Sequence, residues 1–418
     1  MTKSASRLKR LGPGLITGAA DDDPSGIATY SQAGAQFGFN TLWTVLLTYP
    51  LMVGIQIVSA RIGAFSGHGL ATNIGRYFPR WLLYFIVALL LIANVINIAA
   101  DLVAMGDAVT LVIGGPHHIY ALALGVMSIF LQVMIPYKRY VNLLKWLTLS
   151  LFAYVGTIFA LHIDWAEVAT RTFVPHFSWS RDYLTMIVAI FGTTISPYLF
   201  FWQASQEVEE QHSAPRADAL KRRPDEAAAG VSRMKFDTCV GMGVSNAVAF
   251  FIMLTTAVTL HQHGGHLIES STQAASALKP VAGEFAFALF SLGIIGCGML
   301  AIPVLAGSAA YAMAGAFNWE NSLEDKPQKA KRFYSVIAVA TLLGVGLAFS
   351  AVNPIQALFW SAVINGVIAV PVMAIMMLMA VNPRIMGRFV IGTKMRILGW
   401  CATVAMTASV LGMAATML

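Results

Sequence analysis

Charge is what this sequence has least of. Asp, Glu, Lys and Arg make up 11% of its 418 residues, whereas about a quarter of the residues in a soluble domain are charged. Hydrophobic residues account for 57%. This balance excludes an ordinary soluble domain and is typical of a membrane-spanning protein. We attribute the net charge of +7 to membrane topology, so we expect a lipid bilayer as partner and no nucleic acid.

Cysteine is scarce too, and so is anything that resembles catalytic machinery. Cys239, Cys297 and Cys401 all lie in apolar runs and are odd in number, so we expect neither a structural disulfide nor a metal-thiolate site. A secretory cleavage signal is not expected, because three aspartates interrupt the first apolar run. At membrane depth the sequence offers no nucleophile–base pair and no His-rich metal cluster. We therefore expect no enzyme and no cofactor.

Apolar runs recur along the whole chain. A helix needs about 20 residues to cross a hydrocarbon core of about 30 Å, and most of the runs reach that length. We therefore expect an all-α integral membrane protein with about 11 transmembrane helices, near 12–36, 42–62, 81–112, 118–136, 140–162, 182–205, 236–261, 281–316, 332–351, 354–380 and 395–417.

The basic residues predict the orientation of these spans. With the N-terminus inside, the inner segments hold 24 of the 27 Lys and Arg residues, and only Arg171, Arg181 and Lys279 fall elsewhere. Such asymmetry is the positive-inside signal. It predicts a cytoplasmic N-terminus and an odd number of spans, in a multi-pass protein of the bacterial inner (plasma) membrane.

The first span is broken by polar residues. Asp21, Asp22 and Asp23 precede Pro24, Ser25 and Gly26 in the middle of an apolar run. Each carboxylate at that depth costs about 2.5–3.5 kcal/mol on insertion scales. Pro and Gly break the helix and free backbone carbonyls, which are tolerated in a membrane only where they are buried in protein or line a cavity. Carboxylates and carbonyl oxygens together favour a cation site.

A second break occurs in the sixth span, at Pro197. Spans 1–5 and 6–10 form two halves, 12–162 and 182–380, and 395–417 is an additional span. Five spans in each half make the second inverted relative to the first. Interrupted helices at matching positions of inverted halves point to a transport site near the membrane midplane. The alternative for either break alone is a simple proline kink.

The residues around both breaks resemble a known family. Gly12-Pro13-Gly14-Leu15-Ile16 followed by Asp23-Pro24-Ser25-Gly26 resembles the first helix of the Nramp metal-ion transporters, whose motif there is Asp-Pro-Gly-Asn. Gly192-Thr193-Thr194-Ile195-Ser196-Pro197-Tyr198 resembles their sixth-helix Gly-Ala-Thr-Val-Met-Pro-His. The resemblance implies a LeuT-type 5+5 inverted repeat with broken helices 1 and 6. It also implies the import of divalent transition metals, often with protons.

The departures from these motifs indicate a divergent branch, similar to the magnesium-type relatives of the family. Asp23 keeps the metal-binding aspartate, but Gly26 replaces an asparagine ligand. Ser196 replaces a methionine, Tyr198 a histidine, and Thr193 an alanine whose backbone carbonyl is a ligand. Thioethers suit softer metals, whereas carboxylates, carbonyls, hydroxyls and water suit magnesium, calcium and manganese.

We expect the metal to be bound by oxygen atoms of Asp23, Thr193 or Thr194, and Ser196, with Gly26 leaving room for retained water. Asp22 or Asp21 is expected near the entrance; the alternative is that one of them, Asp22 above all, caps the second half-helix. The full set of candidate metal-site residues is Asp23, Thr193, Ser196, Gly26, Asp22, Thr194 and, as a weaker member of the tenth span, Asn365.

Two acids of the third span are candidate proton or ion relays. Asp101 lies deep in the span and resembles an acidic stretch of the family's third helix, while Asp107 lies nearer the outer end. The structural alternative for Asp101 is a hydrogen bond to Asn94, to Asn97 or to a neighbouring helix. Glu207, Glu209 and Glu210 end the sixth span. The alternatives for them are an exit vestibule and a solvated helix end, and we favour the solvated helix end.

Together these features predict a secondary transporter that imports a hard divalent cation, such as Mg²⁺ or Mn²⁺, with weak or absent proton coupling. The metal is its substrate, and we expect a monomer or weak oligomer. Alternatives are a proton-coupled Mn²⁺/Fe²⁺ importer, an organic-solute symporter of the same fold, or a relative that does not transport. Three acids in the first break argue against an anionic substrate group.

Overall fold

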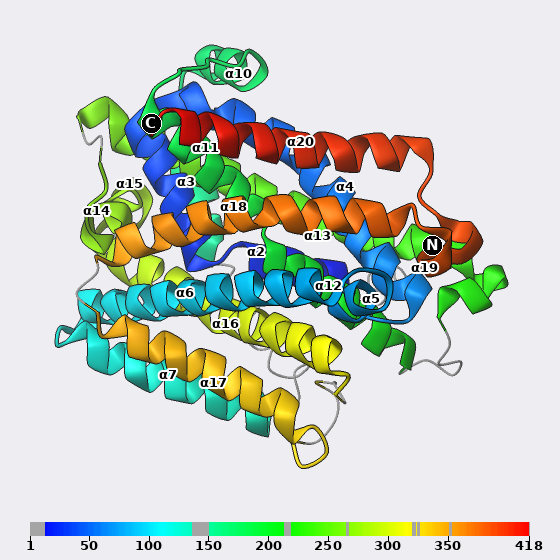
Figure 1. The fold of residues 1–418 in the computed structure, drawn as a ribbon. Coiled ribbons are helices and arrows are strands. Elements are labelled where there is room, and N and C mark those ends of the chain that lie inside the picture. Colours follow the sequence, from blue (N-terminus) through cyan, green and yellow to red (C-terminus); the bar gives the residue numbers. More distant parts are fainter. Residues whose placement is uncertain are drawn as a thin grey trace, which may run out of the picture.

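The computed structural model describes residues 13–135, 150–212, 219–264, 267–319, 323, 327–350 and 353–417. Within these ranges all regular structure is helical, as predicted (Figure 1). The principal helices are α2 (Pro13–Asp21), α3 (Pro24–Phe37), α4 (Leu42–Ser66), α6 (Arg80–Ile113), α7 (His117–Met134), α9 (Phe152–Ala160), α11 (Arg181–Thr194), α12 (Pro197–His212), α13 (Pro224–Thr259), α16 (Ala286–Phe317), α17 (Lys331–Ala348), α18 (Pro354–Ala380) and α20 (Thr393–Ala415).

Short helices join these long ones. They are η1 (Gly38–Thr41), α5 (Leu70–Tyr77), α10 (Trp165–Phe173), η3 (Leu220–Arg222), η4 (His261–His263), α14 (Ser271–Ser276), α15 (Lys279–Ala282), η5 (Gly283–Phe285), α19 (Pro383–Met386) and η6 (Gly387–Phe389). Figure 1 shows α14 and α15 at one end of the bundle, and α5 and α19 at the other. We call the latter the inner end, because the basic residues predict it to be cytoplasmic.

Nine helical stretches of the described chain are long and apolar enough to cross a membrane. One of them, Pro24–Ser66, contains both the second half of the first predicted span and the whole second span. The predicted span 140–162 lies partly outside the described residues, and α9 is its described part. Every other predicted span coincides with one stretch, so the expected helical membrane architecture is confirmed.

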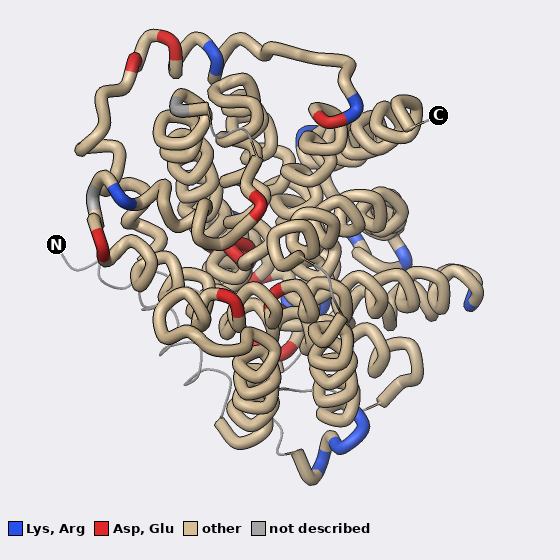
Figure 2. Tube along the Cα trace, turned by 90° about the vertical axis from the view of Figure 1, so that its left-hand side faces the viewer, with Lys and Arg blue, Asp and Glu red and all other residues tan. Residues whose placement is uncertain are grey.

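The outer surface of the bundle is apolar. Ile92 of α6, Phe130 of α7, Val339 of α17 and Val404 of α20 are each more than half exposed. Large exposed apolar surfaces of this kind mark contact with something other than water, which is lipid for helices of this length and hydropathy. Figure 2 shows where the charged residues lie: most of the chain is uncharged, but some acidic residues lie inside the bundle.

The first and sixth spans are both broken, as predicted. α2 stops at Asp21 and α3 begins at Pro24, while α11 stops at Thr194 and α12 begins at Pro197. Close packing holds the half-helices in place. A Cβ on Gly18 of α2 would lie 2.2 Å from the carbonyl carbon of Gly241 in α13, and one on Gly192 of α11 would lie 2.0 Å from the Ala362 oxygen of α18. Only glycine permits such backbone contact.

Candidate functional site

Asp23 starts the second half of the first broken helix. Its Oδ1 accepts hydrogen bonds from the backbone N–H of Gly26 and from Ser25 Oγ, both at 2.7 Å, and Pro24 occupies the first helical position. An acidic cap followed by proline is a strong helix start. The cap that sequence reasoning assigned to Asp22 or Asp21 as an alternative therefore belongs to Asp23.

Ser196, in the break of the sixth span, contacts backbone carbonyls at the end of α11. Ser196 Oγ lies within hydrogen-bonding distance of the carbonyls of Gly192 and Thr193, at 2.7 and 2.8 Å. The Thr193 carbonyl, expected to be free for a metal, thus has a donor nearby, although a hydroxyl donates its one hydrogen to only one carbonyl at a time. The Thr193 hydroxyl is buried and has no partner among the described residues.

Thr194 differs from its neighbour. Its hydroxyl donates to the Ile190 carbonyl at 2.6 Å and lies 2.9 Å from the hydroxyl of Tyr30 on α3. The first contact lies within α11 and the second holds α11 against α3, and together they engage the hydroxyl. The structure therefore favours Thr193 over Thr194 as the source of a ligand hydroxyl.

The two breaks face each other. A Cβ built on Gly26 would lie 3.1 Å from Thr193 Oγ1 and 3.5 Å from the Asp21 carbonyl oxygen. From the other half, the Tyr198 hydroxyl of α12 lies 3.1 Å from the Ala20 carbonyl and 3.4 Å from Asp23 Oδ2. The position of Gly26 therefore keeps the space between the breaks clear of a side chain.

Asn97 of α6 completes the surroundings of Asp23. Its Nδ2 donates to Asp23 Oδ2 at 3.0 Å, and its Oδ1 is buried without a partner among the described residues. Asp101 follows one helical turn later, is fully buried, and neither of its carboxylate oxygens has a hydrogen-bond partner there. Residues four apart share a helix face, so α6 presents amide and carboxylate oxygens on the side that contacts Asp23.

The structural alternative for Asp101 is wrong. Asn94 instead donates to the Leu305 carbonyl and to Ser308 Oγ of α16, at 2.8 and 2.7 Å, and Asn97 is engaged with Asp23. Asp107 is partly exposed and lies about 9 Å further along the axis of α6, at 1.5 Å per residue. The structure thus separates the two predicted relay residues.

Asn365 lies in α18 beside the second break. It is buried, and its Nδ2 has no partner among the described residues. The next residue, Gly366, packs against Gly192, where a Cβ on Gly192 would lie 2.5 Å from the Gly366 nitrogen. Asn365 is therefore near α11, and its membership of the site stays a prediction.

Asp21 and Asp22 point to a different helix from Asp23. Ser245 Oγ of α13 lies 2.6 Å from Asp21 Oδ2 and 2.9 Å from Asp22 Oδ1. Asp22 also lines a small cavity of about 70 Å³ between α2, α9 and α13, together with Leu15, Ala19 and Val248. The three consecutive acids thus diverge, with Asp23 toward α6 and the other two toward α13, and Asp22 does not share the partners of Asp23.

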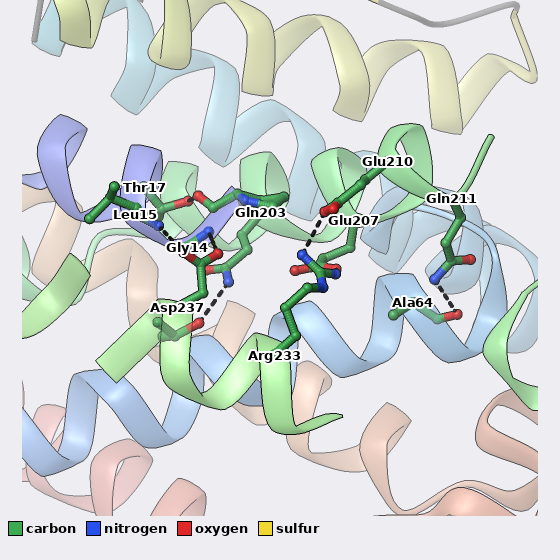
Figure 3. Close-up of polar contacts among 12 residues, drawn as sticks. Gly14, Leu15, Thr17, Ala64, Gln203, Glu207, Glu210, Gln211, Arg233 and Asp237 are labelled. Atoms are coloured by element: carbon green, nitrogen blue, oxygen red, sulfur yellow. Dashed lines mark hydrogen bonds and ion pairs between the residues drawn. The ribbon is translucent and has the colours of Figure 1, made fainter. Parts of the chain in front are cut away.

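A polar network lies on the inner side of the breaks (Figure 3). Asp237 of α13 accepts hydrogen bonds from the backbone N–H groups of Gly14 and Leu15, at 2.7 and 3.1 Å, and so caps the first turn of α2. Gln203 of α12 donates to Thr238 at 3.0 Å. α2 and α12, the half-helices on the inner side of the breaks, therefore both form hydrogen bonds with α13.

The acidic end of α12 belongs to this network. Arg233 forms ion pairs at 2.6 Å with Glu207, which is fully buried, and with Glu210. Glu209 is also buried and accepts from the Tyr311 hydroxyl at 2.5 Å and the Leu323 N–H at 2.7 Å. The prediction of a solvated helix end is wrong for Glu207 and Glu209, because partners from other helices cover them.

Sequence reasoning missed Asn97 as a partner of Asp23, and it missed Ser245 and Asp237 entirely. Each is a polar residue inside or beside an apolar run. An intramembrane ionisable residue is a functional candidate by default, which would have singled out Asp237. Nothing in the local sequence says which helix it contacts.

On the outer side a larger cavity, of about 440 Å³, opens between the ends of α3, α11 and α18. Gln32, Asp182, Glu269 and Arg181 are among its lining residues. Asp23 itself is only 2% exposed. The breaks are thus buried. A cavity lies between them and the outer end of the bundle, and hydrogen bonds to α13 close the inner side.

Chemically, the region between the breaks is an oxygen site. Its polar atoms come from carboxylates, an amide, hydroxyls and carbonyls, and thioether or thiolate sulfur takes no part in the contacts described above. Several of these buried oxygens, including both of Asp101, have no donor in the described chain. Buried acceptors without donors are costly, and a hard cation would satisfy them.

Comparison with known proteins agrees with this architecture. The family model described as natural resistance-associated macrophage protein-like, or Nramp, matches residues 14–416. Among curated proteins, the chain is 24% identical over 376 residues to a protein of Caldanaerobacter subterraneus named divalent metal cation transporter, covering 85% of this chain and 81% of that one. A Klebsiella pneumoniae protein of the same name is 24% identical and covers 97% of this chain and 93% of its own.

Solved structures share the fold. The manganese transporter of Eremococcus coleocola aligns with a TM-score of 0.73 at 17% identity, over 98% of this chain and 87% of that one. The transporter MhsT, solved with L-phenylalanine, aligns with a TM-score of 0.58 at 13% identity, over 96% and 98% of the two chains. Both likenesses establish the LeuT-type arrangement of two inverted repeats with broken helices 1 and 6.

Proposed function

Because the chain belongs to the Nramp family, we propose that it imports divalent metal cations by alternating access, through a site between the α2–α3 and α11–α12 breaks. The observation that carries this proposal is the meeting of Asp23, Asn97 and Thr193 in a buried oxygen site. Curated relatives named divalent metal cation transporters support it. We further propose that the protein lies in the bacterial inner membrane with its N-terminus in the cytoplasm, and that it is a monomer or a weak oligomer. We place its two repeats at 12–162 and 182–380.

We assign Asp23 Oδ2, Asn97 Oδ1 and Thr193 Oγ1 as ligand atoms, with Asp101 one turn from Asn97. Asp23 Oδ1 is engaged by the cap of α3 at 2.7 Å. Oδ2 has only the longer contacts with Asn97 Nδ2 at 3.0 Å and the Tyr198 hydroxyl at 3.4 Å, so we assign Oδ2 to the metal. Asn97 supplies the amide that Gly26 cannot. Retained water and the carbonyls near the breaks would complete a hard coordination shell.

For the substrate we propose Mg²⁺ or Mn²⁺ rather than a soft ion. The support is chemical: Ser196 stands where a thioether would favour softer metals, and Gly26 leaves space for a partly hydrated ion. We also propose weak or absent proton coupling, because Tyr198 replaces a titratable histidine and its hydroxyl faces an acceptor, the Ala20 carbonyl. A proton-coupled manganese importer is the second candidate, favoured by the buried acid Asp101.

The test of the site is metal flux into proteoliposomes. Asp23→Asn and Asn97→Ala should each reduce Mn²⁺ or Mg²⁺ uptake at least tenfold, the loss of one charge-assisted contact of about 1.5–3 kcal/mol. Asn94→Ala is the matched control, since Asn94 is buried on the same helix but bonds α16. Equal loss in Asn94→Ala and Asn97→Ala would show a structural effect and refute the ligand assignment.

The substrate class is tested by competition. With tracer Mn²⁺ and equal concentrations of competitor, Mg²⁺ should compete better than Cd²⁺, and amino acids should not compete. Stronger competition by Cd²⁺ would refute the hard-ion argument. A pH dye inside the vesicles tests whether protons are coupled to metal transport. Internal acidification that follows metal uptake with the membrane potential clamped, and that disappears in Asp101→Asn, would refute uncoupled transport.

A further inference from the structure

A basic cavity lies at the inner end of the bundle, apart from the oxygen site. It has a volume of about 260 Å³ and is formed by the α4–α5 loop, α5, the end of α12 and η3. Its described lining contains no acidic residue and consists of Ser66, Gly67, His68, Asn73, Arg76, Tyr77, Gln211, His212, Ala219, Lys221 and Arg222.

The walls of this cavity are held by hydrogen bonds rather than formed by loosely placed side chains. Asn73 is buried, and its Nδ2 lies 2.8 Å from Ser66 Oγ and 2.9 Å from the His68 carbonyl. Gln211 donates to the Ala64 carbonyl at 2.9 Å and joins α12 to α4 (Figure 3). Lys221 Nζ reaches the Ile385 carbonyl at 3.4 Å. α5 and the end of α12 are thus fixed to α4, and η3 is held to α19. The cationic side chains line the space between these elements.

The electrostatics of the cavity are unbalanced. Burial lowers the pKa of His68, and the nearby charges of Arg76, Lys221, His212 and Arg222 lower it further. Burial likewise lowers the pKa of Lys221, with Arg222 and Arg76 as further causes. The neighbouring charges thus disfavour the protonated forms of His68 and Lys221, and the described lining of the cavity includes no carboxylate. A bound anion would relieve this repulsion.

We propose that this cavity binds a phosphate group at the inner face, carried either by a soluble anion or by the headgroup of an anionic lipid. A phosphate offers several acceptor oxygens and a charge between −1 and −2, which suits convergent Arg, Lys and His donors. Basic pockets between helices on the cytoplasmic side bind lipid headgroups in this way. The volume is below the range of about 300–1,000 Å³ typical of drug-sized ligands, so it fits a headgroup or small anion.

The place of the cavity gives the anion a structural consequence. Gln211 and His212 end α12, the inward half of the second broken helix, while Ser66 ends α4. A phosphate held between His68, Arg76 and Lys221 joins the α4–α5 loop, α5 and η3 beside the end of α12. This site is independent of the proposed metal site, since none of its residues belongs to either break.

The proposal is tested with the full chain and a charge-removed variant, Arg76→Gln with Lys221→Gln. The matched control is Lys394→Gln with Arg396→Gln, which removes two exposed basic residues of α20 outside the cavity. In one arm, inorganic phosphate is titrated in neutral detergent and binding is followed by the thermal midpoint at constant ionic strength. In the other, native mass spectrometry measures retention of phosphatidylglycerol against phosphatidylcholine.

Wild type and control should bind at least tenfold more tightly than the cavity variant in one of the two arms. Binding in the phosphate arm identifies a soluble anion, and binding in the lipid arm alone identifies a headgroup. Equal binding by all three proteins in both arms, or none by the wild type in either, would overturn the proposal.

If the variant fails to fold, hydrogen exchange on the wild type still decides. Phosphate or phosphatidylglycerol should slow exchange at 66–73 and leave α20 unchanged. Unchanged exchange at 66–73 with both ligands would overturn the proposal.

Discussion

Asp237 should control how readily α2 leaves α13. It accepts two backbone N–H groups at the start of α2, at 2.7 and 3.1 Å, and all three residues are largely covered. In alternating access an inward opening separates such half-helices from the rest of the bundle. We therefore expect Asp237→Ala to favour the inward-open state, because the carboxylate bonds α2 only while the inner side is closed.

The size of this effect follows from the contacts. Removing a helix cap destabilises by about 0.5–2 kcal/mol, and hydrogen bonds to charged groups contribute about 1.5–3 kcal/mol each. Water solvates the freed N–H groups once α2 has moved, so we take a net value of about 2 kcal/mol. Because each 1.4 kcal/mol is a factor of ten, the inward-open population should rise about 30-fold.

The assay is labelling of a single cysteine at Ala19, which lines the small cavity between α2, α9 and α13. The native residues Cys239, Cys297 and Cys401 are replaced first. A membrane-impermeant thiol reagent applied from the inner side should label Ala19→Cys faster in Asp237→Ala. The control is Asp164→Ala, which also removes a carboxylate that accepts two consecutive N–H groups, but on the exposed helix α10. An unchanged rate in a folded Asp237→Ala protein would refute the reasoning.

Three further outcomes are expected. Gly241→Ala should also speed labelling of Ala19→Cys, since its Cβ would lie 2.4 Å from the Gly14 carbonyl oxygen; slower labelling would contradict this. Arg233→Ala should lower the thermal midpoint far more than Glu210→Gln, because the Arg233 substitution leaves the fully buried Glu207 unpaired. Breaking a buried ion pair in this way costs about 3–5 kcal/mol. Equal midpoints for the two variants would contradict this prediction. The pKa of His68 is lowered in the folded protein, so the unfolded chain binds a proton at His68 as the pH falls through about 6.5 while the folded protein does not. The stability of the ligand-free wild type should therefore fall more below about pH 6.5 than that of His68→Gln. Thermal melts at pH 5.5–8 measure this difference.

The sequence predicted the backbone of this protein better than its contacts. Apolar runs located the described spans because hydropathy and span length are local properties. Both breaks were predicted because a proline inside a helix removes a backbone hydrogen bond whatever the helix packs against. The alternative that Asp22 or Asp21 caps the second half-helix was wrong, since Asp21, Asp22 and Asp23 are chemically identical and only the turn geometry decides that Asp23 bonds Gly26.

Contacts between distant segments were beyond local reasoning. Asn97 and Asp23 are 74 residues apart, and Asp237 and Gly14 are 223 apart. No spacing rule relates such residues; only the packing of α6 and α13 against the first broken helix brings them together. Glu207 was misjudged for the same reason, because its partner Arg233 lies across the α12–α13 connection.

The contacts on the two sides of the breaks differ in kind, and this difference bears on the direction of transport. On the inner side, α2 is held by a carboxylate cap and by backbone contact between Gly18 and Gly241. On the outer side, α3 is held by hydrogen bonds to the backbone, such as Gln32 with the Ile268 N–H at 2.9 Å and His261 with the Ala35 carbonyl at 2.8 Å. It also makes a close backbone contact with α13, since a Cβ on Gly34 would lie 2.2 Å from the Met253 oxygen. Hydrogen bonds to charged groups contribute about twice as much as neutral ones, and the carboxylate cap of Asp237 has no counterpart among these outer hydrogen bonds. We therefore expect opening toward the outer cavity to require less energy in the metal-free protein. A cation that arrives from outside and draws Asp23, Asn97 and Thr193 together would supply the energy to open the inner side, which is the order of steps an importer needs.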